Sequence, residues 1–326
     1  MIRCLQIAQQ ALGSARPNPM VGAIVVHQNK IIGEGFTSAY GGPHAEVNAI
    51  ASVRNKALLK DSTLYVSLEP CNHFGKTPPC TQLIKDSKIP RVVIGCLDDH
   101  PLVAGKGVET LKSAGVTVTV GVLKNQCQRH HKRFFTFHNK KRPYVILKWA
   151  ETTDGFIAPN KKLLQRPVWI SNTYSRQLTH KWRAEEQAIL VGKQTVLADN
   201  PSLTVRDWTG NHPTRVIVGR HFDDFNEASY TVFNTAAETI KITIQKNRPF
   251  AQQVLKQLHE RNISSVIVEG GSFVLHKFIE ENLWDEARVF KSAVALRTGL
   301  PAPTIQFQPS KSISIANDQL YYYYHD

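Results

Sequence analysis

The first 120 residues alternate short apolar runs with segments of helical periodicity. Apolar runs rich in β-branched residues predict buried strands, and apolar positions three or four residues apart predict amphipathic helices. The predicted strands cover residues 22–27, 63–68, 91–96 and 116–120. The predicted helices cover residues 45–53, 81–86 and 107–114. This alternation is typical of an α/β layer structure.

A second α/β series begins after Arg142-Pro143, which we take as a domain boundary. Its predicted strands cover residues 144–149, 187–191, 214–218, 240–244 and 265–268. Its predicted helices cover residues 174–182, 250–260 and 273–280. The run from Tyr321 to Tyr324 predicts an edge or terminal strand. A chain of 326 residues is long enough for two cores, so we expect domains at 1–143 and 144–326.

The chain is strongly basic, with a formal net charge of +14. Such an excess implies an anionic partner, either a nucleic acid or a phosphorylated small molecule. Residues 124–142 contain seven Lys or Arg, three His and no acid, interleaved with Phe134, Phe135 and Phe137. This stretch is either a nucleic-acid-binding surface or an amphipathic helix with packed phenylalanines, and we favour the helix.

The five cysteines favour a reducing cytoplasm over a disulfide framework, because their number is odd and two of them fit a metal pattern. No segment approaches the roughly 20 apolar residues of a membrane span. The N-terminal apolar stripe is too short for the apolar region of a signal peptide. We therefore expect a cytoplasmic protein with no membrane partner.

The motif with the clearest chemistry is His44-Ala45-Glu46, followed by Pro70-Cys71 and by Cys80. One His and two Cys can hold zinc in three of four tetrahedral positions, and an open fourth position is typical of catalytic zinc. His-x-Glu with Pro-Cys-x-x-Cys is the zinc deaminase pattern. Here, however, eight residues separate the two cysteines.

This motif predicts a hydrolytic deamination. Zinc lowers the pKa of a bound water towards neutrality and gives hydroxide as the nucleophile. Glu46 would take the water's proton and pass it to the leaving ammonia. We expect His44 at the start of one helix and Cys71 near the start of the next. Two alternatives remain: unrelated core residues, or a structural zinc with His73 or Cys96 as fourth ligand.

Residues 70–80 (PCNHFGKTPPC) resemble the PCSHxGKTPPC element of the riboflavin-biosynthesis deaminases. Residues 16–22 (RPNPMVG) and 103–107 (VAGKG) are similar to two more of their elements. In the second half, Lys148-Trp149-Ala150, residues 195–206 (TVLADNPSLTVR) and Glu269-Gly270-Gly271 resemble the reductase half of the same bifunctional family. The resemblance therefore covers the whole chain.

This resemblance implies a cytidine-deaminase-like three-layer domain followed by a dihydrofolate-reductase-like domain. It implies deamination of 2,5-diamino-6-(5-phosphoribosylamino)pyrimidin-4(3H)-one at a zinc hydroxide, then reduction of the ribosyl group to ribityl by NADPH. The partners implied are Zn²⁺, NADPH, a phosphorylated pyrimidine and other copies of the chain in a homo-oligomer, but no nucleic acid.

The family's functional residues fall on matching positions of this chain. The zinc ligands would be His44, Cys71 and Cys80, and Glu46 would carry the proton. The deaminase substrate would contact Asn18, His73 and Lys76. The cofactor would contact Ala150, Trp169, Thr195, Asp199, Gly270 and Gly271. The reductase substrate would contact Lys148, Arg183, Leu203, Arg206 and Glu269, with Lys148 and Asp199 near the reacting ribose.

Six positions, at five places in the chain, depart from the family pattern. Thr37 replaces a His, His100 replaces an Asn, and Pro167 replaces a Ser. Gly219-Arg220 replaces Asp-Ser, so Arg220 either serves a cofactor 2′-phosphate or is a surface residue. Arg297 lies in a turn that is glycine-rich in the family.

Two other functions stay open at this point. A nucleic-acid base deaminase shares His-x-Glu but predicts two residues between the cysteines. A zinc-containing nucleic-acid-binding protein would use residues 124–142, and its binding would depend steeply on salt.

Overall fold

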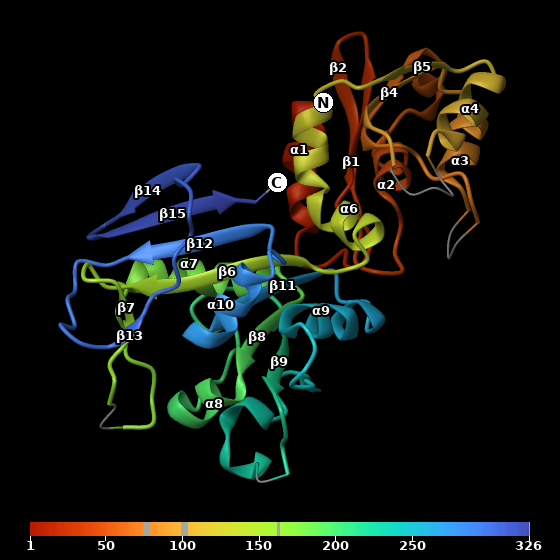
Figure 1. The fold of residues 1–326 in the computed structure, drawn as a ribbon. Helices are drawn as coiled ribbons and strands as arrows, with labels where there is room; N and C mark the ends of the chain where they lie inside the picture. The colour runs from red at the N-terminus through yellow and green to blue at the C-terminus, as the bar shows by residue number, and fades with distance from the viewer. Residues whose placement is uncertain (75–77, 99–103, 162–163, 224, 326) are drawn as a thin grey trace. The chain divides into compact units, whose positions relative to one another are not determined.

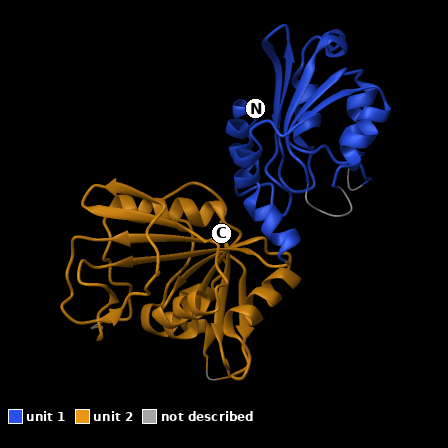
Figure 2. Cartoon of the chain, turned by 45° about the horizontal axis from the view of Figure 1, so that its top comes forward, with its two compact units in different colours: residues 1–140 blue, residues 141–326 orange. Residues whose placement is uncertain are grey.

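The computed structural model describes residues 1–74, 78–98, 104–161, 164–223 and 225–325. The chain divides into two compact units, Met1–Lys140 and Lys141–Asp326 (Figure 2). No helix in the described ranges is long and apolar enough to cross a membrane.

Unit 1 is built on a five-stranded sheet in the order β2-β1-β3-β4-β5 (Figure 1). Strand β1 is antiparallel to β2 and β3, whereas β3, β4 and β5 are parallel. The strands are β1 (Gly22–His27), β2 (Lys30–Phe36), β3 (Thr63–Leu68), β4 (Arg91–Cys96) and β5 (Thr117–Val120). The predicted strands at 22–27, 63–68 and 91–96 are confirmed, whereas β2 was not predicted.

Helices cover both faces of this sheet. Ala23 and Val25 of β1 pack with Ala49 and Ile50 on one face, whereas Ile24 packs with Ile7 on the other. This alternation follows from the two-residue period of a strand. The α-helices are α1 (Ile2–Ala8), α2 (Ala45–Ser52), α3 (Cys80–Asp86), α4 (Lys106–Ser113), α5 (Lys124–His130) and α6 (Lys132–Asn139), and the 3-10 helices are η1 (Gln9–Ala11) and η2 (Lys56–Asp61). Unit 1 therefore has the expected three layers.

Unit 2 contains an eight-stranded sheet in the order β10-β9-β8-β11-β6-β12-β15-β14. The first six strands are parallel, and β15 pairs antiparallel with both β12 and β14. The strands are β6 (Tyr144–Glu151), β8 (Ala188–Gly192), β9 (Thr214–Gly219), β10 (Thr239–Thr243), β11 (Ser265–Gly270), β12 (Glu286–Lys291), β14 (Lys311–Ile315) and β15 (Asp318–Tyr324). The short strands β7 (Phe156–Ala158) and β13 (Leu300–Pro301) form a separate pair.

Helices also cover both faces of this sheet. Val145 and Leu147 of β6 pack in the core cluster that contains Leu255 and Phe278, whereas Ile146 packs against Trp182 on the opposite face. The helices are α7 (Thr173–Glu185), α8 (Lys193–Asp199), α9 (Phe250–Glu260) and α10 (Ser272–Glu280), with 3-10 helices η3 (Glu227–Ser229) and η4 (Thr231–Phe233). This is the mixed α/β architecture expected for the second half.

The tyrosine run is the last strand of the chain, as predicted, but it is not at an edge of the sheet. Strand β15 lies between β12 and β14. A tight turn joins Ile315 to Asp318, so β14 folds back along β15 and forms the edge itself. The pattern of four consecutive tyrosines does not predict the additional strand β14.

Candidate zinc centre and reductase cleft

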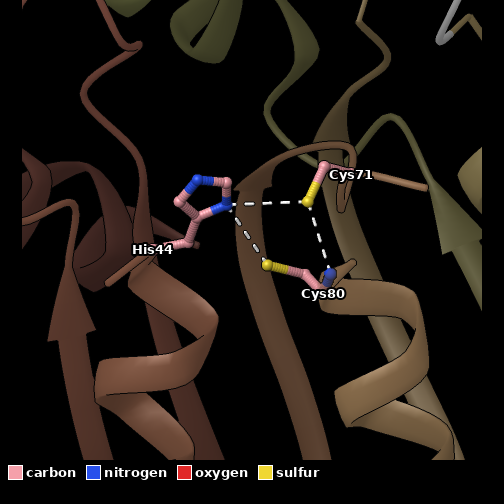
Figure 3. A group of neighbouring side chains, drawn as sticks. All are labelled: His44, Cys71 and Cys80. Carbon is pink, nitrogen blue, oxygen red and sulfur yellow. Dashed lines mark hydrogen bonds between the residues drawn. The ribbon is translucent and has the colours of Figure 1, made fainter. Parts of the chain in front are cut away.

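Three side chains of unit 1 converge on one point (Figure 3). His44 is the N-cap of α2, Cys71 lies in the loop after β3, and Cys80 is the first residue of α3. His44 Nδ1 lies 3.6 Å from Cys71 Sγ and 3.4 Å from Cys80 Sγ. The three donor atoms all lie within 4.8 Å of one another.

This geometry fits a zinc ion. Tetrahedral zinc bonded to one His nitrogen and one Cys sulfur places the two atoms roughly 3.5 Å apart. The two nitrogen–sulfur separations, 3.6 and 3.4 Å, agree with that value. The donor set of one imidazole and two thiolates is also typical of zinc sites.

Neither candidate fourth ligand joins this group. Within the described ranges, the only cluster of three or more possible ligands is His44, Cys71 and Cys80. His73 is exposed, and Cys96 is buried in the core with its Sγ 3.5 Å from the carbonyl oxygen of Ser67. The described residues therefore supply three ligands and leave the fourth position for water or substrate, as in catalytic sites.

The expected place of Cys71 was wrong, although the helix still stabilises its thiolate. Helix α3 begins at Cys80, so Cys71 lies in the preceding loop. The backbone N–H of Cys80, the first of α3, donates to Cys71 Sγ at 3.3 Å. Hydrogen bonding from Cys80 and the proximity of His44 lower the pKa of Cys71 to about 4. This loop therefore presents Cys71 as the thiolate that zinc requires.

Glu46 lies in the first turn of α2 and is 4% exposed. Burial raises the pKa of this carboxyl to about 7, and the negative charge of Cys71 adds to the effect. A carboxyl group with a pKa near neutrality is suited to both accepting and releasing a proton.

The residues expected to contact the deaminase substrate are only partly described. Asn18 is half-buried in the loop before β1, and His73 is exposed in the loop after Cys71. Lys76 and His100 lie outside the described residues. The structure therefore locates two of these positions on loops of unit 1.

Thr37 has a clear structural role at the position where the family has His. Its hydroxyl donates to the carbonyl oxygen of Pro19 at 3.0 Å and accepts from the N–H of Val21 at 3.0 Å. Its own N–H donates to the carbonyl oxygen of Val21. Thr37 thereby fixes the loop that carries Asn18 to the end of β2.

Glu69 is a structural residue next to the candidate zinc site that sequence reasoning missed. Its buried carboxylate accepts hydrogen bonds from four backbone N–H groups, those of Asp98, Gly105, Gly107 and Val108. Glu69 is two positions before Cys71, so one side chain ties the zinc loop to the start of α4. The signal was an acid directly before Pro-Cys.

Replacing Glu69 with Gln should lower the free energy of unfolding of unit 1 by about 2 kcal/mol. The amide nitrogen of Gln donates, so it would face backbone N–H groups that also donate. Urea denaturation measures the change. Glu34→Gln is the control, because Glu34 makes an exposed ion pair with Arg3 that contributes little. Equal stability of both variants would contradict this role.

Unit 2 contains a cleft of about 1580 Å³ at the carboxyl ends of β6, β8, β9 and β11. Helix α8 connects β8 to β9, which lies on one side of the β8–β11 pair. Helix α10 connects β11 to β12, which lies on the opposite side of that pair. The adjacent strands β8 and β11 therefore form a topological switch point, where ligands bind in open α/β sheets. The Gly271 N–H donates to Thr195 Oγ1 at 2.9 Å across this point.

The cleft brings together most of the residues expected to bind cofactor or reductase substrate. Those that line it are Lys148, Ala150, Trp169, Thr195, Asp199, Glu269 and Gly271. Arg183, Leu203, Arg206 and Gly270 do not line it. Leu203 packs in a core cluster with Ile189 and Val196. Lining residues that sequence reasoning did not identify include Lys193, Ile244, Phe250, Phe273 and Lys277.

A buried charge group lies at one end of the cleft. The Arg183 guanidinium donates to both carboxylate oxygens of Glu269, at 3.0 and 2.7 Å. Burial opposes ionisation of Glu269, but Arg183 and Lys148 outweigh it and hold the pKa at about 2. Burial lowers the pKa of Lys148 below its ordinary value, although Glu269 partly opposes this. The cleft thus contains a half-buried ammonium that releases a proton more readily than an exposed lysine.

The departures in unit 2 lie in the cleft or in a turn. Pro167 lines the cleft, as do Gly219 and Arg220. Arg297 has a φ of 63°, in the left-handed region that glycine adopts without strain. Its N–H donates to an Asp154 oxygen at 2.7 Å, and this bond holds the turn.

The basic stretch forms α5 and α6, and its phenylalanines pack as the helix interpretation requires. Phe134 and Phe135 lie against the core of unit 1, and Phe137 is buried. His130 Nε2 lies 3.0 Å from the carbonyl oxygen of Met20, so this segment also supports the loop around Asn18.

Comparisons with known proteins agree with both halves. Residues 1–96 match the cytidine and deoxycytidylate deaminase zinc-binding region. Residues 143–299 match the RibD C-terminal domain.

Several relatives match over most of their length. The riboflavin biosynthesis protein RibD of Aquifex aeolicus is 41% identical, with 91% of this chain and 86% of that protein covered. RibD of Escherichia coli is 31% identical, with 89% and 86% covered. The structure of a diaminohydroxyphosphoribosylaminopyrimidine deaminase/5-amino-6-(5-phosphoribosylamino)uracil reductase from Thermotoga maritima is 38% identical, with a TM-score of 0.89 over 99% of this chain and 96% of that one.

The fold and the two sites define a zinc-dependent deaminase joined to an NADPH-dependent oxidoreductase. The chain belongs to the RibD family of bifunctional riboflavin-biosynthesis enzymes.

Proposed function

We propose that residues 1–143 deaminate 2,5-diamino-6-(5-phosphoribosylamino)pyrimidin-4(3H)-one and that residues 144–326 reduce the ribosyl group of the product to ribityl. The observation that carries the first step is the convergence of His44, Cys71 and Cys80 beside the buried acid Glu46. The close similarity to the Thermotoga maritima deaminase/reductase supports this substrate.

In the deaminase site, His44, Cys71 and Cys80 would hold the zinc. Bound zinc supplies a Lewis acid that makes a water molecule nucleophilic near neutral pH. The Glu46 carboxylate accepts a proton from the attacking water and delivers it to the nitrogen of the leaving amino group. Asn18, His73 and Lys76 orient the substrate, and the cation of Lys76 suits its phosphate.

In the reductase site, Ala150, Trp169, Thr195, Asp199, Gly270 and Gly271 would hold NADPH, which supplies hydride when bound. Reduction to ribityl transfers hydride to the ribose C1′ and breaks the bond between C1′ and the ring oxygen, which takes up a proton. Lys148 Nζ would supply that proton, and the lowering of its pKa by burial supports this role.

The remaining predicted residues of this half would contact the substrate. Arg206 suits the substrate phosphate, because guanidinium binds phosphate through paired hydrogen bonds. Arg183 would add positive charge, since its paired N–H groups already donate to Glu269. Glu269 forms an ion pair with Arg183. The positive charge of Lys148 also stabilises the Glu269 carboxylate. Leu203 would contribute through its backbone, since its side chain lies in the core.

We also propose that the partner is a small phosphorylated molecule and not a nucleic acid, and that the protein is a cytoplasmic homo-oligomer. The net charge of +14 suits a phosphorylated substrate and NADPH together. Light scattering of the purified protein measures the oligomeric state, and a monomer would contradict that part of the proposal.

Mass spectrometry of the reaction mixture tests the proposed function. With the diaminopyrimidinone ribosyl phosphate and NADPH, the substrate should first exchange an amino group for oxygen and then gain two hydrogens. A product that gains hydrogens without exchanging its amino group would contradict this order. An unchanged substrate with zinc-loaded protein would contradict the deaminase assignment.

Removal of zinc should separate the two activities. A chelator that strips zinc should abolish ammonia release, because the three ligands then hold no Lewis acid. NADPH oxidation by the same protein should continue when the deaminated intermediate is supplied, since His44, Cys71 and Cys80 all belong to unit 1. Loss of both activities, with recovery of both on adding zinc, would contradict independent sites.

A further inference from the structure

We propose that Arg220 is the residue by which this chain recognises the adenosine 2′-phosphate of NADPH and thereby prefers NADPH to NADH. The inference concerns the cofactor alone, so it can fail independently of the proposed substrates. It assigns a binding role to one exposed side chain that lines the cleft directly after β9.

The position of Arg220 in the sheet is the first observation. Arg220 directly follows β9, and Lys148 lies on β6. Strands β8 and β11 separate these two strands, which places them three strand spacings apart, roughly 14 Å. Both residues line one continuous cleft that passes the switch point at Thr195 and Gly271. An extended dinucleotide with its reactive ring at Lys148 therefore has its adenosine near Arg220.

The topology at Arg220 matches the place where nucleotide-binding folds choose between the two cofactors. Strand β8, helix α8 and strand β9 form a parallel βαβ unit. In such units an acid at the end of the second strand binds the ribose 2′-OH of NAD, whereas a nearby Arg accommodates the 2′-phosphate of NADP. Here the second strand ends at Gly219, which has no carboxylate, and Arg220 follows.

Local packing explains why the residue before Arg220 is glycine. A Cβ at Gly219 would lie 3.1 Å from the Phe222 ring and 3.3 Å from the Cβ of Lys193. Lys193 Nζ donates to the carbonyl oxygen of His221 at 3.1 Å. Lys193, the first residue of α8, thus stabilises the turn that carries Arg220. Its ammonium is a second positive charge next to that turn.

The charges along the cleft favour an anion at this end. Among the described residues that line it, the cations are Lys148, Lys193, Arg220 and Lys277, and the acids are Asp199, Glu269 and Glu280. Glu269 pairs with Arg183, and Glu280 pairs with Lys277 at 2.6 Å. Arg220 is exposed and has no hydrogen-bond or ion-pair partner within the described ranges.

An apolar surface beside Arg220 suits a purine ring. Ile244, Phe250 and Phe273 line the same cleft, and the Phe250 and Phe273 rings lie edge to face at 5.7 Å. The Ile244 N–H donates to the carbonyl oxygen of Gly219, the residue before Arg220, at 3.0 Å. Phe273 is 59% exposed. It does not belong to any of the hydrophobic core clusters of the described residues. An aromatic face next to a guanidinium provides stacking for adenine and paired hydrogen bonds for the phosphate.

Calorimetric titration of the whole protein with adenosine 2′,5′-bisphosphate and with adenosine 5′-monophosphate tests the inference without catalysis. The native protein should bind the bisphosphate at least about tenfold more tightly, the size expected for a hydrogen-bonded charge pair. Arg220→Gln should remove most of this preference and leave binding of the monophosphate unchanged. Arg220→Lys should restore part of it.

Arg261→Gln is the matched control, because Arg261 is an exposed arginine of the same unit that does not line the cleft. Fluorescence titration with NADPH and NADH repeats the comparison with whole cofactors. Three outcomes would overturn the inference. The native protein could show no preference for the bisphosphate, or Arg220→Gln could keep the full preference. Arg220→Gln could also lose affinity for the bisphosphate and the monophosphate equally. The last would mean that Arg220 supports the turn and not the phosphate.

Discussion

Replacement of Glu46 by Gln should lower kcat/KM for ammonia release by about a thousandfold, while zinc stays bound. Positioned acid–base groups contribute about 10² to 10⁴ in rate, and Gln cannot carry a proton. The side chains have nearly the same shape, so His44, Cys71 and Cys80 keep their positions. Ammonia release measures the rate, and elemental analysis measures zinc per chain.

Glu109→Gln is the control for this variant. Glu109 also lies in the first turn of a helix of unit 1, but it is exposed. It should leave ammonia release unchanged. A Glu46→Gln protein that binds zinc and keeps most of its activity would show that another group carries the proton. A protein that loses its zinc would instead show that Glu46 supports the ligands.

Replacement of Lys148 by Met should lower kcat for NADPH oxidation by about a hundredfold or more and leave ammonia release unchanged. Met keeps the length of the side chain but has neither the charge nor the proton. Stability should be preserved, because Glu269 retains its paired bonds to Arg183 and the cost of burying an ammonium disappears. The assay supplies the deaminated intermediate and follows the fall in NADPH absorbance.

The pH profile distinguishes a proton donor from a merely structural lysine. If protonated Lys148 is required, kcat falls as pH rises through its pKa, which burial places below that of an ordinary lysine, about 10.4. Lys148→Met should lose this limb of the profile. Lys256→Met, an exposed lysine of α9, should keep both rate and profile. An unchanged profile in Lys148→Met would contradict the role as donor.

The sequence predicted most strands of both sheets, and the strand it missed in unit 1 has a physical reason. Strand β2 (Lys30–Phe36) contains Gly33 and Gly35, which usually indicate a turn. Helix α2 crosses this strand so closely that a Cβ at Gly35 would collide with the amide nitrogen of Ala49. The glycines thus permit close packing on a helix that the strand pattern alone does not reveal.

The convergence of His44, Cys71 and Cys80 could be predicted because their residue types and spacing are restrictive, but the start of the helix after Cys71 could not. The strand-to-helix pattern suggested Cys71 at a helix start, whereas the long loop delays α3 until Cys80. Contacts between residues far apart in the chain also could not be predicted from the sequence. Arg183 and Glu269 are 86 residues apart, and only the β8-β11-β6 order brings them together. Glu69 likewise meets amides about 30 to 40 residues away.

The most direct test of two ordered reactions in one chain follows ammonia and NADPH in the same cuvette. With zinc-loaded protein and the diaminopyrimidinone ribosyl phosphate, ammonia should appear first and NADPH absorbance should fall after a lag. Glu46→Gln should suppress both signals with this substrate but still oxidise NADPH when given the deaminated intermediate. Immediate NADPH oxidation without ammonia, or with Glu46→Gln on the diamino substrate, would contradict the proposed sequence of reactions.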